Sequence, residues 1–216
     1  MKNIFYLIAF FLTLSHFCQA QIRLNEGVTS VLVYGKALGD TDETIEGSKY
    51  IDSEFKYFSV NGSETKYLIR YNALQDLMEH KSENNTILLL NKDATKIVHN
   101  QEIVFELITE NNLSQYHQIL VDTNDIKLTK VQKVNINKAR PAKNSYEESV
   151  PAHYKRIKDQ YFVYFQGVLH PFDGKQNSLI KIFPTKINAI KLFYSKNKVD
   201  LTEKGILLLK NLFDNF

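Results

Sequence analysis

Short runs of apolar and aromatic residues, separated by polar turns, fill most of the chain between residues 28 and 172. β-branched and aromatic side chains dominate these runs, which is typical of half-buried β-strands. Asn61-Gly62 lies between the runs 55–60 and 66–71, and this dipeptide is the strongest short-range signal for a β-hairpin. Gly62 is therefore expected to have a positive φ. The other strands that the pattern predicts are 28–38, 77–81, 86–90, 96–98, 102–108, 115–121, 126–136, 154–158 and 161–169.

The character of the chain changes after Pro171. Residues 178–183 are predicted to form a short helical segment, and Pro184 stands where the first turn of a helix tolerates proline. Asp200 and Glu203 form an acceptable capping pair for a last helix that is apolar nearly all round. Two sets of apolar residues at helical spacing support these helices: Ile187, Ile190, Phe193 and Tyr194, and then Ile206, Leu207, Leu208, Leu209, Leu212 and Phe213.

These patterns predict an α+β protein, in which a mostly antiparallel, β-rich body is followed by a small C-terminal helical unit. The expected organisation is a signal peptide at residues 1–20, the β-rich body at 21–172 and the helical unit at 173–216. The densest aromatic run is Tyr161–Phe165. Because the helices need an apolar surface on which to dock, we expect them to cover this run. The alternative is an exposed aromatic platform that contacts sugars or lipids.

The first twenty residues have the three parts of a secretory signal peptide. Lys2 supplies a positive n-region, Ile4–Leu14 is the apolar h-region, and Ala20 is the small residue before a cleavage expected at Gln21. The apolar run is too short for a good transmembrane anchor, so no transmembrane segment is expected after cleavage. We therefore expect an extracytoplasmic protein of the cell envelope, either periplasmic or secreted.

Composition and cysteine content narrow the possible chemistry. With 44% hydrophobic and 24% charged residues, 8 Gly and 4 Pro, the chain has the composition of a folded globular protein. The only cysteine, Cys18, would leave with the signal peptide. A mature chain without a thiol cannot form disulfides, use a thiolate in catalysis or bind a metal through cysteine. Cys18 is also a poor lipidation site, because Phe17 stands where a small residue is needed.

Charged residues are unevenly distributed, although the formal net charge is only +3. Residues 40–54 carry six acidic residues and one lysine, whereas 126–146 and 174–199 each carry six basic residues and no acid. A cationic patch of this kind would attract an anionic surface; the alternative is a set of solvated lysines that keep the protein soluble. The expected partner is an anionic envelope component or another envelope protein, and no nucleic acid is expected. The candidate cationic surface consists of Lys181, Lys186, Lys191, Lys196 and Lys198.

Three segments resemble a group of secreted proteins of Bacteroidota that have no assigned activity. They are Gly47-Ser48-Lys49-Tyr50-Ile51-Asp52-Ser53-Glu54-Phe55, Leu68-Ile69-Arg70-Tyr71-Asn72 and Leu179-Ile180-Lys181-Ile182-Phe183-Pro184. In that group these segments look like a "G-[ST]-P-Y-L…F" entry, an "L-R-Y-N" strand and an "L-[LI]-K-[LI]-F-P" helical ending. The resemblance implies a location in the cell envelope, and it implies no functional residue.

No sequence motif for catalysis, cofactor binding or metal binding is recognisable. His80, His99 and His117 could meet on neighbouring strands and bind zinc, but isolated histidines on strands are far more common. The alternating oxygen ligands of residues 40–46 could suit calcium, yet a solvated acidic loop is the better interpretation, because the EF-hand glycine and terminal glutamate are missing. We therefore expect no catalytic residue, no cofactor and no metal.

The sequence favours a non-enzymatic envelope protein, a β-rich module that binds or scaffolds a macromolecular partner. Two alternatives stay open. One is a secreted hydrolase whose catalytic residues are scattered along the chain. The other is a carrier of a small lipophilic ligand, with a cavity between the sheet and the helices.

Overall fold

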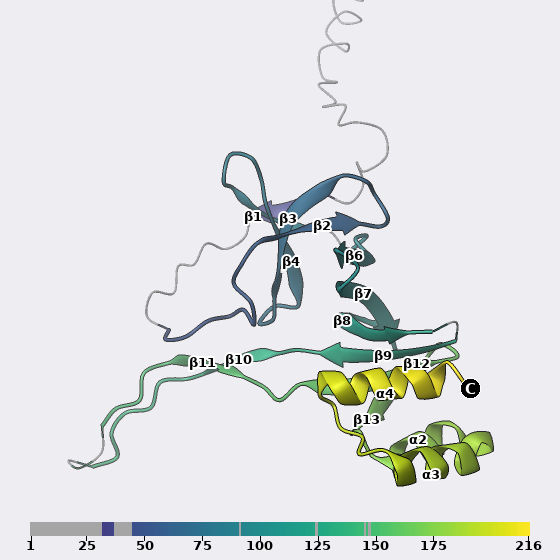
Figure 1. Ribbon diagram of the computed structural model, residues 1–216. Coiled ribbons are helices and arrows are strands. Elements are labelled where there is room, and N and C mark those ends of the chain that lie inside the picture. The colour runs from purple at the N-terminus through teal and green to yellow at the C-terminus, as the bar shows by residue number, and fades with distance from the viewer. Residues whose placement is uncertain (1–31, 37–44, 91, 124, 145, 147) are drawn as a thin grey trace, which may run out of the picture. The chain divides into compact units, whose positions relative to one another are not determined.

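The computed structural model of the protein describes residues 32–36, 45–90, 92–123, 125–144, 146 and 148–216. The predicted signal peptide and most of the acidic loop at 40–46 lie outside these residues. Within the described residues, one large antiparallel sheet and a separate two-stranded ribbon are followed by a C-terminal group of helices (Figure 1). This arrangement confirms the predicted α+β class with a β-rich body.

The strands of the large sheet are arranged as two meanders that are joined through the pairing of β2 with β6. Their order across the sheet is β1-β5-β4-β3-β2-β6-β7-β8-β9-β12-β13, and every neighbouring pair is antiparallel. Short turns can connect those antiparallel neighbours that are consecutive in sequence. The bounds are β1 Leu32–Lys36, β2 Lys56–Val60, β3 Lys66–Asn72, β4 Leu77–Lys81, β5 Ile87–Leu90, β6 Lys96–His99, β7 Ile103–Glu110, β8 Leu113–Asp122, β9 Ile126–Val131, β12 Gln160–Phe165 and β13 Val168–Phe172. The ribbon pairs β10 (Val134–Asn137) with β11 (His153–Arg156).

Four of the turns between described strands have two consecutive residues with positive φ, and two of these turns contain a glycine. Asn61 and Gly62, with φ of 50° and 79°, connect β2 to β3 and confirm the predicted hairpin. Gln166 and Gly167, with φ of 50° and 81°, connect β12 to β13 in the same way. The prediction of one strand over 161–169 is therefore wrong, because the chain reverses where Gly167 accepts a left-handed conformation.

The prediction of one strand over 126–136 is also wrong, because the chain leaves the large sheet after β9. The backbone N–H of Val134 donates to the carbonyl of Ala73 at 3.1 Å, and β10 then pairs with β11. Farther from the sheet, Arg140 and Val150 exchange two backbone hydrogen bonds. Since β9 pairs directly with β12, the ribbon is an insertion between two neighbouring strands (Figure 1).

The helical unit docks on the last strands of the sheet. It consists of α2 (Gln176–Ile182), a 3-10 turn η1 (Pro184–Lys186), α3 (Ile187–Lys196) and α4 (Glu203–Phe213). Leu209 and Phe213 of α4 share a buried cluster with Leu179 of α2 and Val163 of β12. The expected packing of the last helix on the aromatic strand is thus confirmed. A second buried cluster lies among the strands from β2 to β8 and contains Phe58, Ile69, Met78, Ile97 and Tyr116.

The start of α4 differs in detail from the prediction. Thr202, rather than Asp200, is the capping residue, and its Oγ1 accepts from the backbone N–H of Gly205 at 3.5 Å. Asp200 instead supports the cap, because its Oδ1 accepts from the backbone N–H of Thr202 at 3.0 Å. The helix is not buried all round, since Leu208 is half-buried and Leu207 is 60% exposed.

Candidate functional site

Four of the five lysines predicted to form a cationic surface face solvent. Lys181 is in the last turn of α2, Lys191 and Lys196 are on α3, and Lys198 follows that helix. None of the four forms an ion pair with any part of the chain that the structure describes. Their positive charges are therefore available to an external anion.

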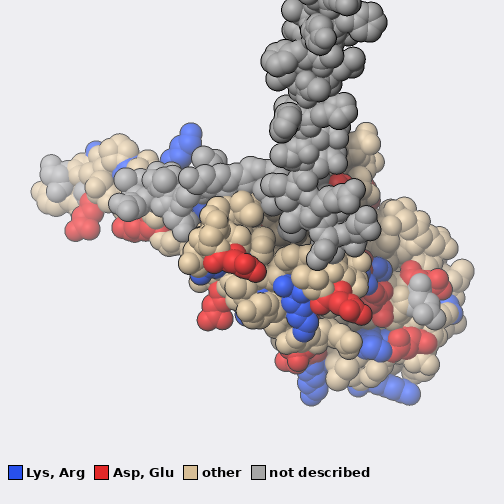
Figure 2. Space-filling model, turned by 90° about the horizontal axis from the view of Figure 1, so that it is seen from above, with Lys and Arg blue, Asp and Glu red and all other residues tan. Residues whose placement is uncertain are grey.

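The two acidic residues at the ends of this lysine-rich segment are engaged locally. Asp173 accepts a hydrogen bond from the hydroxyl of Ser178, which lowers the pKa of Asp173, and its carboxylate lies 3.4 Å from the Lys175 ammonium. Asp200 accepts from the side chain of Thr202, which lowers the pKa of Asp200. On the face that Figure 2 shows, acidic and basic side chains are interspersed.

Leu192 lies at the centre of the outward face of α3. Ile190 is buried and Phe193 is half-buried, and together they mark the inner face of the helix. At about 100° per residue, position 192 points away from them and has Lys191 and Lys196 on its two sides. Leu192 is 56% exposed. The outward face of α3 therefore combines an apolar side chain with two flanking cations.

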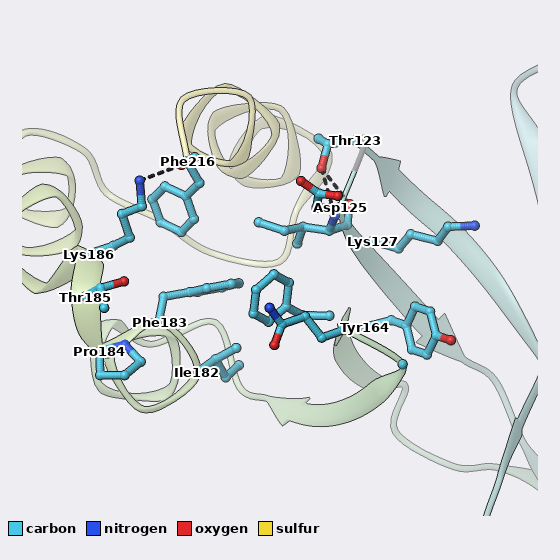
Figure 3. Close-up of a pocket in the computed structure, with 14 residues that line it drawn as sticks. Thr123, Asp125, Lys127, Tyr164, Ile182, Phe183, Pro184, Thr185, Lys186 and Phe216 are labelled. Atoms are coloured by element: carbon cyan, nitrogen blue, oxygen red, sulfur yellow. Dashed lines mark hydrogen bonds between the residues drawn. The ribbon is translucent and has the colours of Figure 1, made fainter.

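The fifth lysine, Lys186, lies in a different environment. It is half-buried, its Nζ donates to the carbonyl oxygen of Phe216, and it lies 5.6 Å from the centroid of the Phe216 ring. Figure 3 shows this bond at one side of a groove of about 830 Å³. Lys186 thus belongs to the groove, whereas the other four lysines of the candidate cationic surface are exposed.

The groove has an aromatic lining. The ring centroids of Phe165 and Phe183 are 5.0 Å apart, and those of Phe183 and Phe216 are 4.9 Å apart. Polar side chains line the groove as well, among them Asp125 and Gln166. Thr123 exchanges two hydrogen bonds with the backbone of Ile126, at 2.8 and 3.2 Å. The groove therefore combines an aromatic wall with a polar rim.

Lys127, which also lines this groove, does not contribute its charge to it. Its ammonium group is 2.5 Å from the Glu106 carboxylate, and Figure 3 shows the side chain pointing away from Phe183 and Phe216. Burial tends to raise the pKa of Glu106, but hydrogen bonds from Lys127 and Lys96 outweigh it and lower that pKa. This ion pair belongs to the surface of the sheet.

The β10–β11 ribbon exposes a second set of charges. Lys138, Arg140, Lys143 and Lys155 are exposed, and so is Glu148. Tyr146, near the end of the ribbon, is 99% exposed. Because this region carries charges of both signs around one aromatic side chain, it is a less uniform surface than α3.

The histidines considered for zinc each have separate partners. Nδ1 of His80 is 3.1 Å from the carbonyl of Leu68, and Nδ1 of His99 is 2.8 Å from the carbonyl of Tyr57. His117 is buried, with its Nδ1 2.9 Å from the Thr129 hydroxyl, and burial lowers its pKa to about 4. Among the described residues, no group of three or more His, Asp or Glu side chains could hold a metal ion.

The helices cover one face of the aromatic run Tyr161–Phe165, as expected. Val163 is buried in the same cluster as the helical residues, the ring of Phe165 packs on that of Phe183, and on the opposite face the ring of Phe162 meets that of His117 edge-on, with centroids 5.5 Å apart. Tyr164 and Phe165 also line the groove.

Sequence reasoning missed Leu192 as part of the surface. The signal was present, because Ile187, Ile190, Phe193 and Tyr194 define one face of the helix and leave position 192 on the other.

Comparison with protein-family models, with curated proteins and with solved structures gave no match for this chain. Within the described residues, no helix is both long enough and apolar enough to cross a membrane.

Proposed function

We propose that this protein is an exported, non-enzymatic module of the cell envelope that binds or scaffolds an anionic envelope component through its helical unit. The observation that carries the proposal is the set of exposed lysines Lys181, Lys191, Lys196 and Lys198 in a segment without acidic residues. Because these charges form no ion pair with the described residues, they keep their attraction for an external anion. Such attraction orients the protein as it meets an anionic partner, and it weakens as the salt concentration rises.

The test is the salt concentration at which the protein elutes from a polyanion column. In the helical variant, the four lysines of the surface are changed to glutamine, and we expect elution at clearly lower salt. The matched ribbon variant carries Lys138→Gln, Arg140→Gln, Lys143→Gln and Lys155→Gln, and we expect a smaller shift. Equal shifts in the two variants would contradict the assignment of the binding surface to the helical unit.

Export is the second part of the proposal. Support comes from the three-part segment at residues 1–20 and from the resemblance to secreted proteins of Bacteroidota. Intact-mass analysis of protein from the native host should give a chain that begins at Gln21. A mass that retains residues 1–20, or that includes acyl chains on Cys18, would contradict this expectation.

The partner can be identified by crosslinking in intact native cells. We expect the helical unit to be attached to an anionic envelope component or to another envelope protein. The helical variant should lose this product and the ribbon variant should keep it. Retention of the same product by the helical variant would place the contact elsewhere on the molecule.

A second candidate function, carriage of a small lipophilic ligand, is favoured by the aromatic groove of about 830 Å³. Thr185 is exposed and lines the groove, so Thr185→Trp should fill part of it without disturbing the core. A fluorescent fatty acid should bind the parent protein and bind this variant more weakly. Equal binding to both would exclude the groove as the ligand site. No observation on the described residues favours the hydrolase alternative.

A further inference from the structure

We infer that α3 docks on the surface of an anionic lipid bilayer, with Leu192 entering the interface and the lysines beside it contacting lipid phosphates. This inference rests on the proposed function and names the class of its anionic partner.

The outward face of α3 has the arrangement that an interfacial helix needs. Leu192 is at its centre, and the small or polar residues Asn188, Ala189 and Ser195 complete the exposed surface. None of these side chains is acidic or bulky, so the helix can approach a flat surface closely. The apolar face of α3 is buried in the protein, so Leu192 alone would enter the interface, with the lysine ammonium groups at the level of the headgroups, where cations of membrane-surface helices lie.

The charge of the surrounding segment complements an anionic bilayer. Lys191 and Lys196 flank Leu192, while Lys181 and Lys198 belong to the same acid-free stretch. Long lysine side chains can keep the ammonium group at the headgroup level while their methylene groups lie along the apolar zone. Basic residues close to an anionic bilayer each strengthen binding about fivefold, and the effect is lost at high salt.

Position in the fold favours α3 over the other exposed apolar side chains. Figure 1 shows α2 and α3 at the edge of the helical unit, on the side of α4 away from β9. Leu207 of α4 is 60% exposed, and Lys204 and Lys210 lie on the same outward side of its helix as Glu203 and Asp214. Two cations and two anions leave that side without net charge, and Lys210 pairs with Asp214 at 2.7 Å. Tyr146 of the ribbon has Glu148 close to it in sequence. The outward side of α3, by contrast, carries an exposed leucine and two lysines and no acidic residue.

The test uses tryptophan as a depth probe, because the chain contains no tryptophan of its own. Leu192→Trp and the matched control Leu207→Trp each place a single indole at an exposed position. Both full-chain variants are purified from the native host and mixed with phosphatidylcholine vesicles, with or without about 30% phosphatidylglycerol. We expect a blue shift of the emission for Leu192→Trp with the anionic vesicles at low salt, and no shift for Leu207→Trp.

Cosedimentation with the same vesicles measures affinity. Leu192→Ser should weaken binding about five- to tenfold, since part of a leucine side chain no longer leaves water, whereas Leu207→Ser should leave binding unchanged. Lys191→Gln and Lys196→Gln should each weaken it about fivefold. Thermal melting of each variant checks that the fold is intact.

Two outcomes would overturn the inference. One is equal blue shifts or equal losses of affinity at positions 192 and 207. The other is failure of the parent protein to bind the anionic vesicles. If the lysine-dependent retention on a polyanion column persists in that second case, the proposed function stands and the partner is an anionic polymer or protein. If that retention is also absent, both proposals are wrong.

Discussion

Arg70 and Glu79 lie directly opposite each other on β3 and β4, where Nε of the guanidinium donates to Oε2 of the carboxylate at 2.8 Å and Nη2 lies 2.8 Å from the same oxygen. The guanidinium also lies over the rings of Tyr50 and Phe55, 3.8 and 4.3 Å from their centroids. The other oxygen of Glu79 accepts from the side-chain amide of Asn72 at 2.8 Å. This network fixes the segment before β2 against the sheet.

Removal of the carboxylate from this network should strongly destabilise the protein. Glu79→Ala leaves the Arg70 guanidinium, which is only 10% exposed, without its counterion, and it also removes the acceptor for Asn72. We expect the free energy of unfolding to fall by about 3 kcal/mol, as for other buried ion pairs that lose one partner. Urea unfolding measures this loss. Glu83→Ala, in the exposed turn between β4 and β5, is the control, and a similar effect of both substitutions would contradict the role of the network.

The hairpin glycine allows the conformational cost of a positive φ to be measured alone. Gly62 has a φ of 79°, and an added Cβ would meet no atom within 4 Å, so sterically the position is open. Gly62→Val should therefore cost about 1 kcal/mol or more through backbone strain, and Gly62→Asn should cost less, because asparagine tolerates the left-handed region. Thermal melting of the two variants measures the difference. Equal melting temperatures for the parent and the valine variant would place the strain elsewhere.

Much of the β-rich body could be predicted from local signals. From β2 to β8, polar turns separate short apolar runs, and the predicted runs match the observed strands to within two residues at each end. The errors occur where pairing depends on distant residues. Nothing near Val134 indicates that its backbone N–H will bond to Ala73, so the sequence pattern predicts one continuous strand over 126–136.

The sequence predicts which lysines could form the candidate surface, but it does not predict which of them are exposed in the folded protein. The absence of acids between residues 174 and 199 is a property of the sequence. The contact of Lys186 with Phe216, however, joins residues thirty positions apart, and only the packing of the helices brings them together. The same limit applies to the start of α4, where Asp200 and Thr202 can both cap a helix and the position of the first turn decides between them.

The buried imidazole of His117 should make stability depend on pH. Burial lowers its pKa to about 4, whereas in the unfolded chain it should be near 6.5. Above pH 6.5 the ring is neutral in both states, so its full contribution is present. Between pH 6.5 and 4 the unfolded state binds a proton that the native state does not, and stability falls by up to about 1.4 kcal/mol per pH unit.

Comparison with His117→Gln isolates this effect, because glutamine does not titrate. Burial raises the pKa of Asp76, so this carboxyl group makes stability change with pH in the opposite direction. Asp76 is present in both proteins, and its effect therefore cancels in the stability difference between them. The stability difference between parent and variant, from urea unfolding at several pH values, should shrink as the pH falls from 6.5 to 4. A constant difference over this range would show that His117 is protonated in the native state as readily as in the unfolded chain.

Two leucines on α4 separate docking of the helix from its intrinsic stability. Leu209 is fully buried in the cluster that also contains Val163 of β12 and Leu179 of α2, whereas Leu207, two positions earlier, is 60% exposed. Leu209→Ala should lower the free energy of unfolding by about 2–5 kcal/mol, because it removes buried methyl groups and leaves a cavity. Leu207→Ala should change it by less than about 0.5 kcal/mol, because the side chain already faces water and alanine favours a helix at least as well. Both substitutions are leucine to alanine in the same helix, so the difference between them measures packing alone. Urea unfolding with an unchanged m-value would show that each variant still unfolds as a single unit, and near-equal effects at the two positions would mean that α4 does not dock on the sheet in solution.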